Sequence, residues 1–215
     1  MRLVLLGPPG SGKGTQAETL ADELKVPHIS TGELFRVEMA AASDLGKLAE
    51  EYISHGNLVP DEVVNEIMRV RLAQPDCDRF VLDGYPRTVQ QAQALHEILA
   101  SLERPICLAI DVEVPDEAIV GRAVGRLTCP DCGAIYHLTS KPPRLMGICD
   151  VCRGLLATRK DDQPSTVRHR LSVYHRITRP VLDYYRACGL LRSVSGVGTR
   201  EEVGERLRAE LRGVC

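Results

Sequence analysis

Short runs of consecutive apolar residues recur along the chain, most of them ending near a glycine or an aspartate. Such runs are typical of strands that are buried on both faces of a parallel sheet. We therefore predict strands at 2–7, 79–84, 106–112 and 190–196, with a shorter one at 28–30. The first of these reads RLVLLG and the second reads RFVLDG.

Between these runs the apolar positions have helical spacing, as at Leu20 and Leu24, which stand four residues apart. Strands that alternate with helices indicate an α/β fold with a doubly wound parallel five-stranded sheet and helices on both faces. Ligands of such a sheet gather at the carboxyl ends of the strands, where Gly7, Asp83 and Asp111 fall. The helices are expected at 13–24, 61–73, 88–101, 115–125, 164–187 and 199–212.

Two stretches depart from this alternation. Residues 30–59, the helical insert, have a helical pattern and no strand, and residues 125–162, the cysteine insert, hold four cysteines, several prolines and little helical periodicity. We predict that both are inserts on a core formed by 1–29, 60–124 and 163–215.

The overall charge gives no sign of a polyanionic partner. The chain has 27 basic and 29 acidic residues, a net charge of −2, and few aromatic residues, so neither nucleic acid nor an anionic membrane is an expected partner. The early apolar run LVLL ends at Gly7 and Pro8 and is too short for a membrane span or a signal peptide. We therefore expect a cytoplasmic protein.

The stretch GPPGSGKGTQ lies between the first predicted strand and the first predicted helix. Gly7, Gly12 and Lys13 have the spacing of a P-loop, in which backbone N–H groups and a helix N-terminus bind phosphate and the lysine reaches the terminal phosphates. The hydroxyl that usually follows the lysine is replaced by Gly14, and Thr15 comes one position later. The alternative is a turn of glycine and proline with an exposed lysine.

Four of the eight cysteines form two C-x-x-C pairs, CPDC and CDVC, which enclose residues 133–148. In a chain without an export signal, pairs at this separation are typical of a structural zinc site with four thiolate ligands, here Cys129, Cys132, Cys149 and Cys152. Free buried cysteines or disulfides are the alternatives. The remaining cysteines have no assigned role: Cys77, Cys107, Cys188 and Cys215.

The full string G-x-P-G-x-G-K-G-T resembles the P-loop of adenylate kinases, a family of nucleoside monophosphate kinases in which glycine after the lysine is normal. The resemblance extends over nearly the whole chain, in the family's order, through STGELFR, GNLVPDE, LDGYPRTVQQA, GRAVGR, TRKDD and RHRL. It implies a P-loop NTPase fold and the reaction MgATP + AMP ⇌ 2 ADP, which maintains adenine nucleotide balance. It also implies a helical insert that binds the monophosphate and a cysteine insert that serves as a zinc-bearing lid.

The resemblance assigns roles to the residues that match the family's motifs. The catalytic set is Lys13, Asp83, Arg87, Arg126, Arg159 and Arg170. The ATP-binding set is Gly10, Ser11, Gly12, Lys13, Gly14, Thr15, Arg122, Arg126, Ile135, Tyr136 and Gly198. The AMP-binding set is Thr31, Arg36, Asn57, Leu58, Val59, Gly84, Tyr85, Pro86, Arg87, Gln91, Arg159 and Arg170.

The chemistry of phosphoryl transfer explains why the resemblance assigns so many arginines to the site. Phosphoryl transfer brings several phosphates into contact, so a chain of net charge −2 must concentrate its cations locally. Asp83 resembles the acid that orders waters on Mg²⁺, unless it only caps the next turn. Thr31 matches the position that favours AMP over pyrimidine monophosphates, and Ser30 with Glu33 fits a capping box at the start of the following helix.

The charged residues that flank the cysteine insert have a separate prediction. Arg122 and Arg126 stand four apart, so on a helix they would point to one side, toward ATP. Asp161 and Asp162 are expected to orient the arginines, unless the segment is a solvated charged turn. Arg168 is expected to face solvent.

Three other functions remain open at this point. One is a kinase of the same fold that uses GTP or another monophosphate, and another is a nucleotide sensor without catalysis. The third is a nucleic-acid-binding ATPase with a zinc ribbon, but only Lys141 and Arg144 are basic between Cys132 and Cys149, a thin footprint for phosphate binding. We expect a monomer that binds ATP, AMP and ADP, with Mg²⁺ and a structural Zn²⁺.

Overall fold

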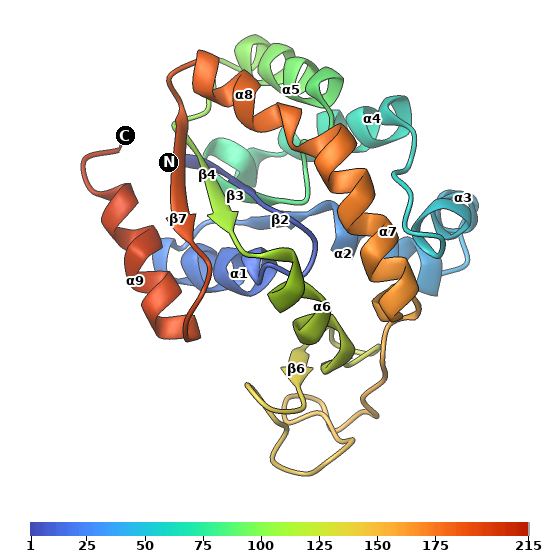
Figure 1. Cartoon of the computed structure of the whole chain (residues 1–215). Helices are drawn as coiled ribbons and strands as arrows, with labels where there is room; N and C mark the ends of the chain where they lie inside the picture. The colour runs from blue at the N-terminus through green and yellow to red at the C-terminus, as the bar shows by residue number, and fades with distance from the viewer. Residues whose placement is uncertain (215) are drawn as a thin grey trace.

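The computed structural model describes residues 1–214, apart from the side chain of Lys160. Five parallel strands form a central sheet in the order β2-β3-β1-β4-β7 (Figure 1). Their bounds are β1 (Arg2–Leu6), β2 (His28–Ser30), β3 (Phe80–Asp83), β4 (Leu108–Glu113) and β7 (Leu191–Ser195). The predicted five-stranded parallel sheet is confirmed.

Helices cover both faces of this sheet. Because successive side chains of a strand point to opposite faces, Leu5 packs in one buried cluster with Leu20 of α1 and Leu207 of α9. Val4 packs on the other face, in a cluster with Leu95 of α5 and with α4 and α8. None of the helices within residues 1–214 is long and apolar enough to cross a membrane. The core helices are α1 (Lys13–Leu24), α4 (Asp61–Leu72), α5 (Val89–Ser101), α6 (Asp116–Val124), α7 (Pro164–Val173), α8 (Pro180–Ala187) and α9 (Arg200–Leu211).

The strand order places the polar residues of the sheet at one edge. β1 lies between β3 and β4, with Leu5 paired to Asp83 and Leu6 paired to Asp111. Since all the strands are parallel, their carboxyl ends meet there, at the point where the chain order changes direction. This is the position at which doubly wound sheets bind ligands.

The helical insert consists of α2 (Thr31–Ala40) and α3 (Asp44–Ile53), packed against each other. Their close approach requires Gly46, because a Cβ at that position would lie 2.1 Å from the carbonyl oxygen of Glu38. At the start of α2 the Ser30 side chain accepts a hydrogen bond from the Glu33 backbone N–H at 3.4 Å. The predicted cap at Ser30 is therefore present.

The cysteine insert projects from one end of the core beyond α6 (Figure 1). Its regular structure is a short antiparallel pair, β5 (Arg126–Thr128) with β6 (Ile135–His137), and a 3₁₀ turn at Lys160–Asp162 leads into α7. The small buried cluster of this insert contains Tyr136 with Cys129 and Cys149. Three-residue strands carry too little hydrophobic pattern to be recognised from sequence.

Two of the predicted helices differ in the structure. The helix expected over 164–187 is divided by a π-helical turn, Tyr174–Thr178, because Pro180 has no N–H to continue the ladder. The Arg179 N–H closes this turn on the Tyr174 carbonyl at 2.8 Å.

The second difference concerns α6, which ends at Val124. Arg126 therefore lies on β5 while Arg122 stays on the helix. The prediction that these two arginines share a helix face is wrong, because Gly125 ends the helix before the second arginine is reached.

We predict that α4 is anchored by its buried face. Met68 is 0 % exposed, so Met68→Ala should lower the free energy of unfolding by about 2–5 kcal/mol in urea denaturation. Val70 on the same helix is 58 % exposed, and Val70→Ala should change it by no more than about 0.5 kcal/mol. Equal losses at the two positions would contradict this packing.

Candidate functional site

A cavity of about 420 Å³ lies between the P-loop and the helical insert. Phe35, Met39, Ile53 and Val64 form an apolar wall that the sequence analysis did not assign, although Phe35 and Met39 have helical spacing on α2. The cavity thus combines an apolar wall with cations. Its predicted lining residues are Lys13, Thr31, Arg36, Asn57, Leu58, Val59, Gly84, Pro86, Arg87, Gln91, Arg159 and Arg170.

The P-loop has the backbone conformation that its glycines predict. Gly7, Gly10 and Gly12 have φ values of 139°, 81° and 89°, which residues with a Cβ rarely adopt. Gly12 starts α1 without a side-chain cap, so the first N–H groups of the helix are available to an anion. The Lys13 Nζ atom donates to the carbonyl of Pro8 at 3.2 Å, which holds the ammonium over the loop.

The carboxylate of Asp83, at the end of β3, lies beside the P-loop next to Gly14. A Cβ at Gly14 would lie 3.1 Å from Oδ2 of Asp83, so glycine gives this carboxylate room beside the loop. Oδ1 of Asp83 is buried and has no hydrogen-bond partner among the described residues. A buried carboxylate oxygen without a donor is costly, and carboxylate oxygen is a ligand that Mg²⁺ and its bound waters prefer. The residues therefore fit a magnesium ion.

Other polar atoms at this edge are also buried without a partner among residues 1–214. They include Oγ of Ser11 and Oδ1 of Asp111. Burial, with a contribution from Glu113, raises the pKa of Asp111 to about 6. Unsatisfied buried polar groups are rare in folded proteins, and three of the seven such atoms among the described residues lie at this edge, which indicates a site for a polar ligand.

Cations from five segments of the chain line the cavity. Burial lowers the pKa of Lys13 to about 8, and the neighbouring Arg87 adds to the shift although Asp83 opposes it. Burial and Arg170 lower the pKa of Arg87 to about 10. Burial and Arg36 lower the pKa of Arg159 to about 9. Each cation thus disfavours the charged form of its neighbours. A bound anion would favour the charged forms and so reverse these pKa shifts.

Two aspartates hold arginines of this group in place. Oδ2 of Asp161 accepts from Arg170 at 2.5 Å. Asp162, which is buried, accepts from Nε of Arg126 at 2.7 Å and from a second nitrogen of the same guanidinium. Burial acts against the charge of Arg126, but this carboxylate outweighs it and raises the pKa. The predicted pairing of the aspartates with arginines is confirmed.

The loop after β3 joins two predicted ligands through one carbonyl. Gly84, at φ 79°, places its carbonyl oxygen so that it accepts from Oγ1 of Thr31 and from Nε of Arg87, both at 2.8 Å. Tyr85 is buried and lies outside the cavity lining, and its hydroxyl donates to Asn65 at 2.7 Å. The Tyr85 side chain therefore supports the loop and does not face the cavity.

Gln91 is buried at the cavity and uses both ends of its amide. Its Oε1 accepts from the backbone N–H of Arg87 at 2.7 Å, and its Nε2 donates to Oδ1 of Asp61 at 2.8 Å. Oδ2 of Asp61 accepts from the Thr88 hydroxyl at 2.6 Å. The sequence analysis assigned no role to Asp61. In the structure this residue lies behind Gln91 and lines no part of the cavity.

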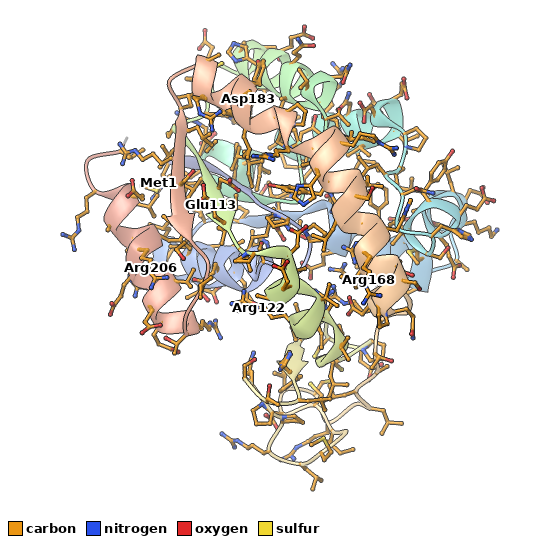
Figure 2. The ribbon with its side chains drawn as sticks, in the orientation of Figure 1. Met1, Glu113, Arg122, Arg168, Asp183 and Arg206 are labelled. Carbon is orange, nitrogen blue, oxygen red and sulfur yellow. The ribbon has the colours of Figure 1, made fainter. Side chains whose placement is uncertain are left out.

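The segment 57–59 lines the cavity between α3 and α4. The side chain of Asn57 is within 2.9 Å of Nε2 of His169 on α7, so the helical insert is tied to that helix. Gly56 lets the chain pass close to the same helix, since a Cβ there would lie 2.9 Å from the side chain of Arg170. Arg168 is exposed, as predicted (Figure 2).

Among the predicted ATP ligands, Arg122 connects the P-loop with the loop that contains Gly198. Figure 2 shows Arg122 on α6, the helix that leads toward the cysteine insert. Its guanidinium donates to the carbonyl of Ser11 at 3.2 Å and to that of Gly196 at 3.1 Å. The loop after β7, which contains Gly198, is thereby tied to the P-loop. Ile135 and Tyr136 lie on β6, where the Tyr136 side chain is buried in the insert and accepts from the Asp150 N–H at 2.8 Å.

The four predicted metal ligands come together. The sulfur atoms of Cys129, Cys132, Cys149 and Cys152 all lie within 4.8 Å of one another. Two of the separations are 3.3 and 3.5 Å, close to the roughly 3.8 Å between sulfurs on one tetrahedral zinc ion. This group can hold a metal ion.

Both C-x-x-C turns are built in the same way. In each, the residue after the second cysteine has a left-handed backbone, Gly133 at φ 75° and Arg153 at φ 66°. The N–H of each of these residues donates to the carbonyl of the first cysteine of its turn at 3.0 Å. Nδ1 of His137 accepts from the backbone N–H groups of residues 139 and 140, so this side chain caps a turn of the insert.

Comparisons with known proteins agree with this geometry. Residues 5–190 match the family described as adenylate kinase. The chain is 50 % identical over 213 residues to an adenylate kinase of Symbiobacterium thermophilum, which covers 99 % of both chains. It is 50 % identical over 208 residues to one of Streptomyces avermitilis, 96 % of this chain and 94 % of the relative. A third, of Caldicellulosiruptor saccharolyticus, is 48 % identical over 215 residues, 100 % of this chain and 99 % of the relative.

We predict that the site lysine reduces stability when no nucleotide is bound. Because the pKa of Lys13 is about 8 in the fold and higher in the unfolded chain, the unfolded state binds more protons above pH 8, and stability rises with pH there. Lys13→Met should therefore be more stable than the wild type by about 1–2 kcal/mol at pH 7, and this advantage should fall by about half at pH 9.5. Urea denaturation at the two pH values measures it.

The control is Lys47→Met, whose side chain is 67 % exposed. This variant should show no pH-dependent advantage. A Lys13→Met variant that is equally or less stable at pH 7 would show that the lysine is not under electrostatic strain.

Proposed function

Because the chain belongs to the adenylate kinase family of phosphotransferases, we propose that it transfers the terminal phosphoryl group of MgATP reversibly to AMP and forms two ADP. The observation that carries this proposal is the cavity that joins the P-loop lysine to half-buried arginines of the core, the helical insert and the cysteine insert. This reversible reaction keeps ATP, ADP and AMP in balance.

The phosphates are divided between two sides of the cation group. ATP phosphates lie against residues 10–15, with the α1 N-terminus and Lys13 as donors. The AMP phosphate lies against Arg36 and Arg87, and the transferred group lies among Arg126, Arg159 and Arg170. The AMP phosphate is already an anionic nucleophile, so direct in-line transfer needs no side-chain base, and catalysis depends on positioning and charge.

Magnesium travels with ATP, neutralises part of the phosphate charge and fixes the phosphate geometry. Asp83 would hold waters of this ion, a role supported by its buried oxygen, which has no partner among the described residues, and by the space that Gly14 leaves.

The two inserts close over the bound phosphates. The helical insert, 30–59, binds the monophosphate, and the cysteine insert, 125–162, is the lid on the core formed by 1–29, 60–124 and 163–215. The two inserts already approach each other, since a Cβ at Gly133 would lie 3.7 Å from Oε1 of Glu33. Closure excludes water, and so prevents transfer of the phosphoryl group to water.

Each nucleotide base has its own contacts. The adenine of AMP lies against Thr31, Gln91 and the backbone of 57–59, which line the cavity with the apolar wall. The adenine of ATP lies near Arg122, Ile135 and Gly198, with the backbone of Tyr136. This placement of the ATP base is supported by Arg122, which ties the P-loop to the loop after β7.

The four cysteines hold a structural Zn²⁺. Four thiolates would complete the coordination shell of such an ion, which would stiffen the lid and supply no chemistry to the reaction. The lid needs it because its buried cluster is small.

We also propose that the enzyme acts as a cytoplasmic monomer without nucleic acid. All of the cations around the cavity come from one chain, so no second copy is needed to complete the site. The thin basic footprint of the lid argues against a nucleic-acid partner.

The first test measures ADP formation from MgATP with AMP, UMP, CMP or GMP offered in parallel. We expect transfer to AMP, and a fall in kcat of about 10²–10³ in Arg170→Ala, because a donor to the transferred phosphoryl group is lost. The matched control is Arg168→Ala, two residues away on α7 and exposed, which should retain wild-type activity.

Three outcomes would count against the proposal. Transfer to another monophosphate would keep the reaction class and overturn the choice of AMP. ATP loss without an acceptor, stimulated by nucleic acid, would overturn the kinase. Equal effects of the two arginine variants would remove Arg170 from the site.

The metal has its own prediction. The purified protein should contain about one zinc ion, and Cys152→Ser should lose most of it and unfold at a midpoint at least about 5 °C lower. Elemental analysis and calorimetry measure both quantities. Cys188→Ser is the control, since Cys188 is exposed and lies outside the group, and should change neither. Full zinc content in Cys152→Ser would contradict the assignment.

A further inference from the structure

We propose that Asp61 determines base specificity by fixing the orientation of the Gln91 amide, so that the site accepts a 6-aminopurine monophosphate and rejects a 6-oxopurine one. The inference deepens the proposed function and rests on it. Asp61 does not line the cavity, so it is a positioning residue that acts through Gln91.

The orientation of the Gln91 amide is determined by its two partners. The carboxylate of Asp61 can only accept, so the group 2.8 Å from it must be the NH₂ end. The backbone N–H of Arg87 can only donate, so the atom 2.7 Å from it must be the oxygen. In a flipped amide, the Gln91 oxygen would face the Asp61 carboxylate, and the Gln91 NH₂ group would face the Arg87 N–H. At 2 % exposure, no water would relieve these two repulsions.

Asp61 is itself held in place. It is the first residue of α4, where a negative charge is favourable, and its second oxygen accepts from the Thr88 hydroxyl at 2.6 Å. The same hydroxyl accepts from the Gln91 backbone N–H at 3.0 Å and so caps α5. The side chain and the main chain of Gln91 are therefore fixed by one network.

The fixed amide still has binding capacity toward the cavity. A primary amide has two N–H donors and two acceptor lone pairs, and each partner above uses only one of them. Adenine offers an acceptor at N1 and a donor at its 6-amino group, whereas a 6-oxopurine offers a donor at N1 and an acceptor at O6. A freely rotating glutamine could turn over to suit either base. The amide fixed by Asp61 presents one order of donor and acceptor only.

The test compares AMP with inosine monophosphate, which has the same size and the reversed order of donor and acceptor. We expect that Asp61→Leu, which removes both acceptors, lowers the ratio of kcat/KM for AMP to that for inosine monophosphate by about 10- to 100-fold. The KM for AMP should rise, while the KM for MgATP should stay unchanged.

Three further variants separate positioning from a general structural role. Asp61→Asn keeps one acceptor for Gln91 and should retain most of the selectivity. Thr199→Val removes the side-chain cap of α9, which packs on the opposite face of the sheet from α5, and should lower stability without changing the ratio. In a Gln91→Leu background, where the ratio is already lost, Asp61→Leu should lower it no further.

The outcomes are distinguishable. An unchanged ratio in Asp61→Leu, or an additive loss in the double variant, overturns the inference and leaves the kinase activity intact. Wild-type enzyme that uses inosine monophosphate as well as AMP overturns it without any variant, even if Asp61→Leu does not fold. Absence of transfer to AMP contradicts the proposed function instead.

Discussion

The structure depends on one electrostatic constraint: a group of half-buried cations that repel one another. Lys13, Arg87 and Arg159 all have lowered pKa values because burial and neighbouring cations oppose their charge. Asp161 and Asp162 neutralise only part of this charge. A bound phosphate group would remove this repulsion, and the free energy lost in the empty site would then contribute to its affinity.

The rest of the fold serves to hold these charges apart and in place. The parallel sheet brings Asp83 beside the P-loop, and Gly14 leaves it room. The helical insert adds Arg36 and the cysteine insert adds Arg159 to the cavity lining, and the cysteine insert also brings its four cysteine sulfurs together. Behind the residues that line the cavity, the Asp61 carboxylate accepts from the Thr88 hydroxyl and from the Gln91 amide, and so fixes the orientation of that amide.

The sequence predicts the sheet, its five strands and most helices because buried parallel strands and amphipathic helices have strong patterns. It fails where single residues decide local geometry, as at Gly125, which ends α6 before Arg126, and at Pro180, which forces a π-helical turn. Resemblance indicated the cavity residues well. It assigned no role to Asp61, whose effect depends on its hydrogen bond to the Gln91 side chain. It also did not predict that the Tyr136 side chain is buried in the cysteine insert.

Proton uptake on nucleotide binding tests the central constraint most directly. At pH 8.5 nucleotide phosphates are fully ionised, whereas Lys13, with a pKa of about 8, is mostly neutral. Calorimetric titration with MgADP in two buffers of different ionisation enthalpy should therefore show uptake of about 0.7 proton per site, absent in Lys13→Met. Binding without proton uptake would show that the half-buried cations carry their full charge before the phosphates arrive, and would contradict this account.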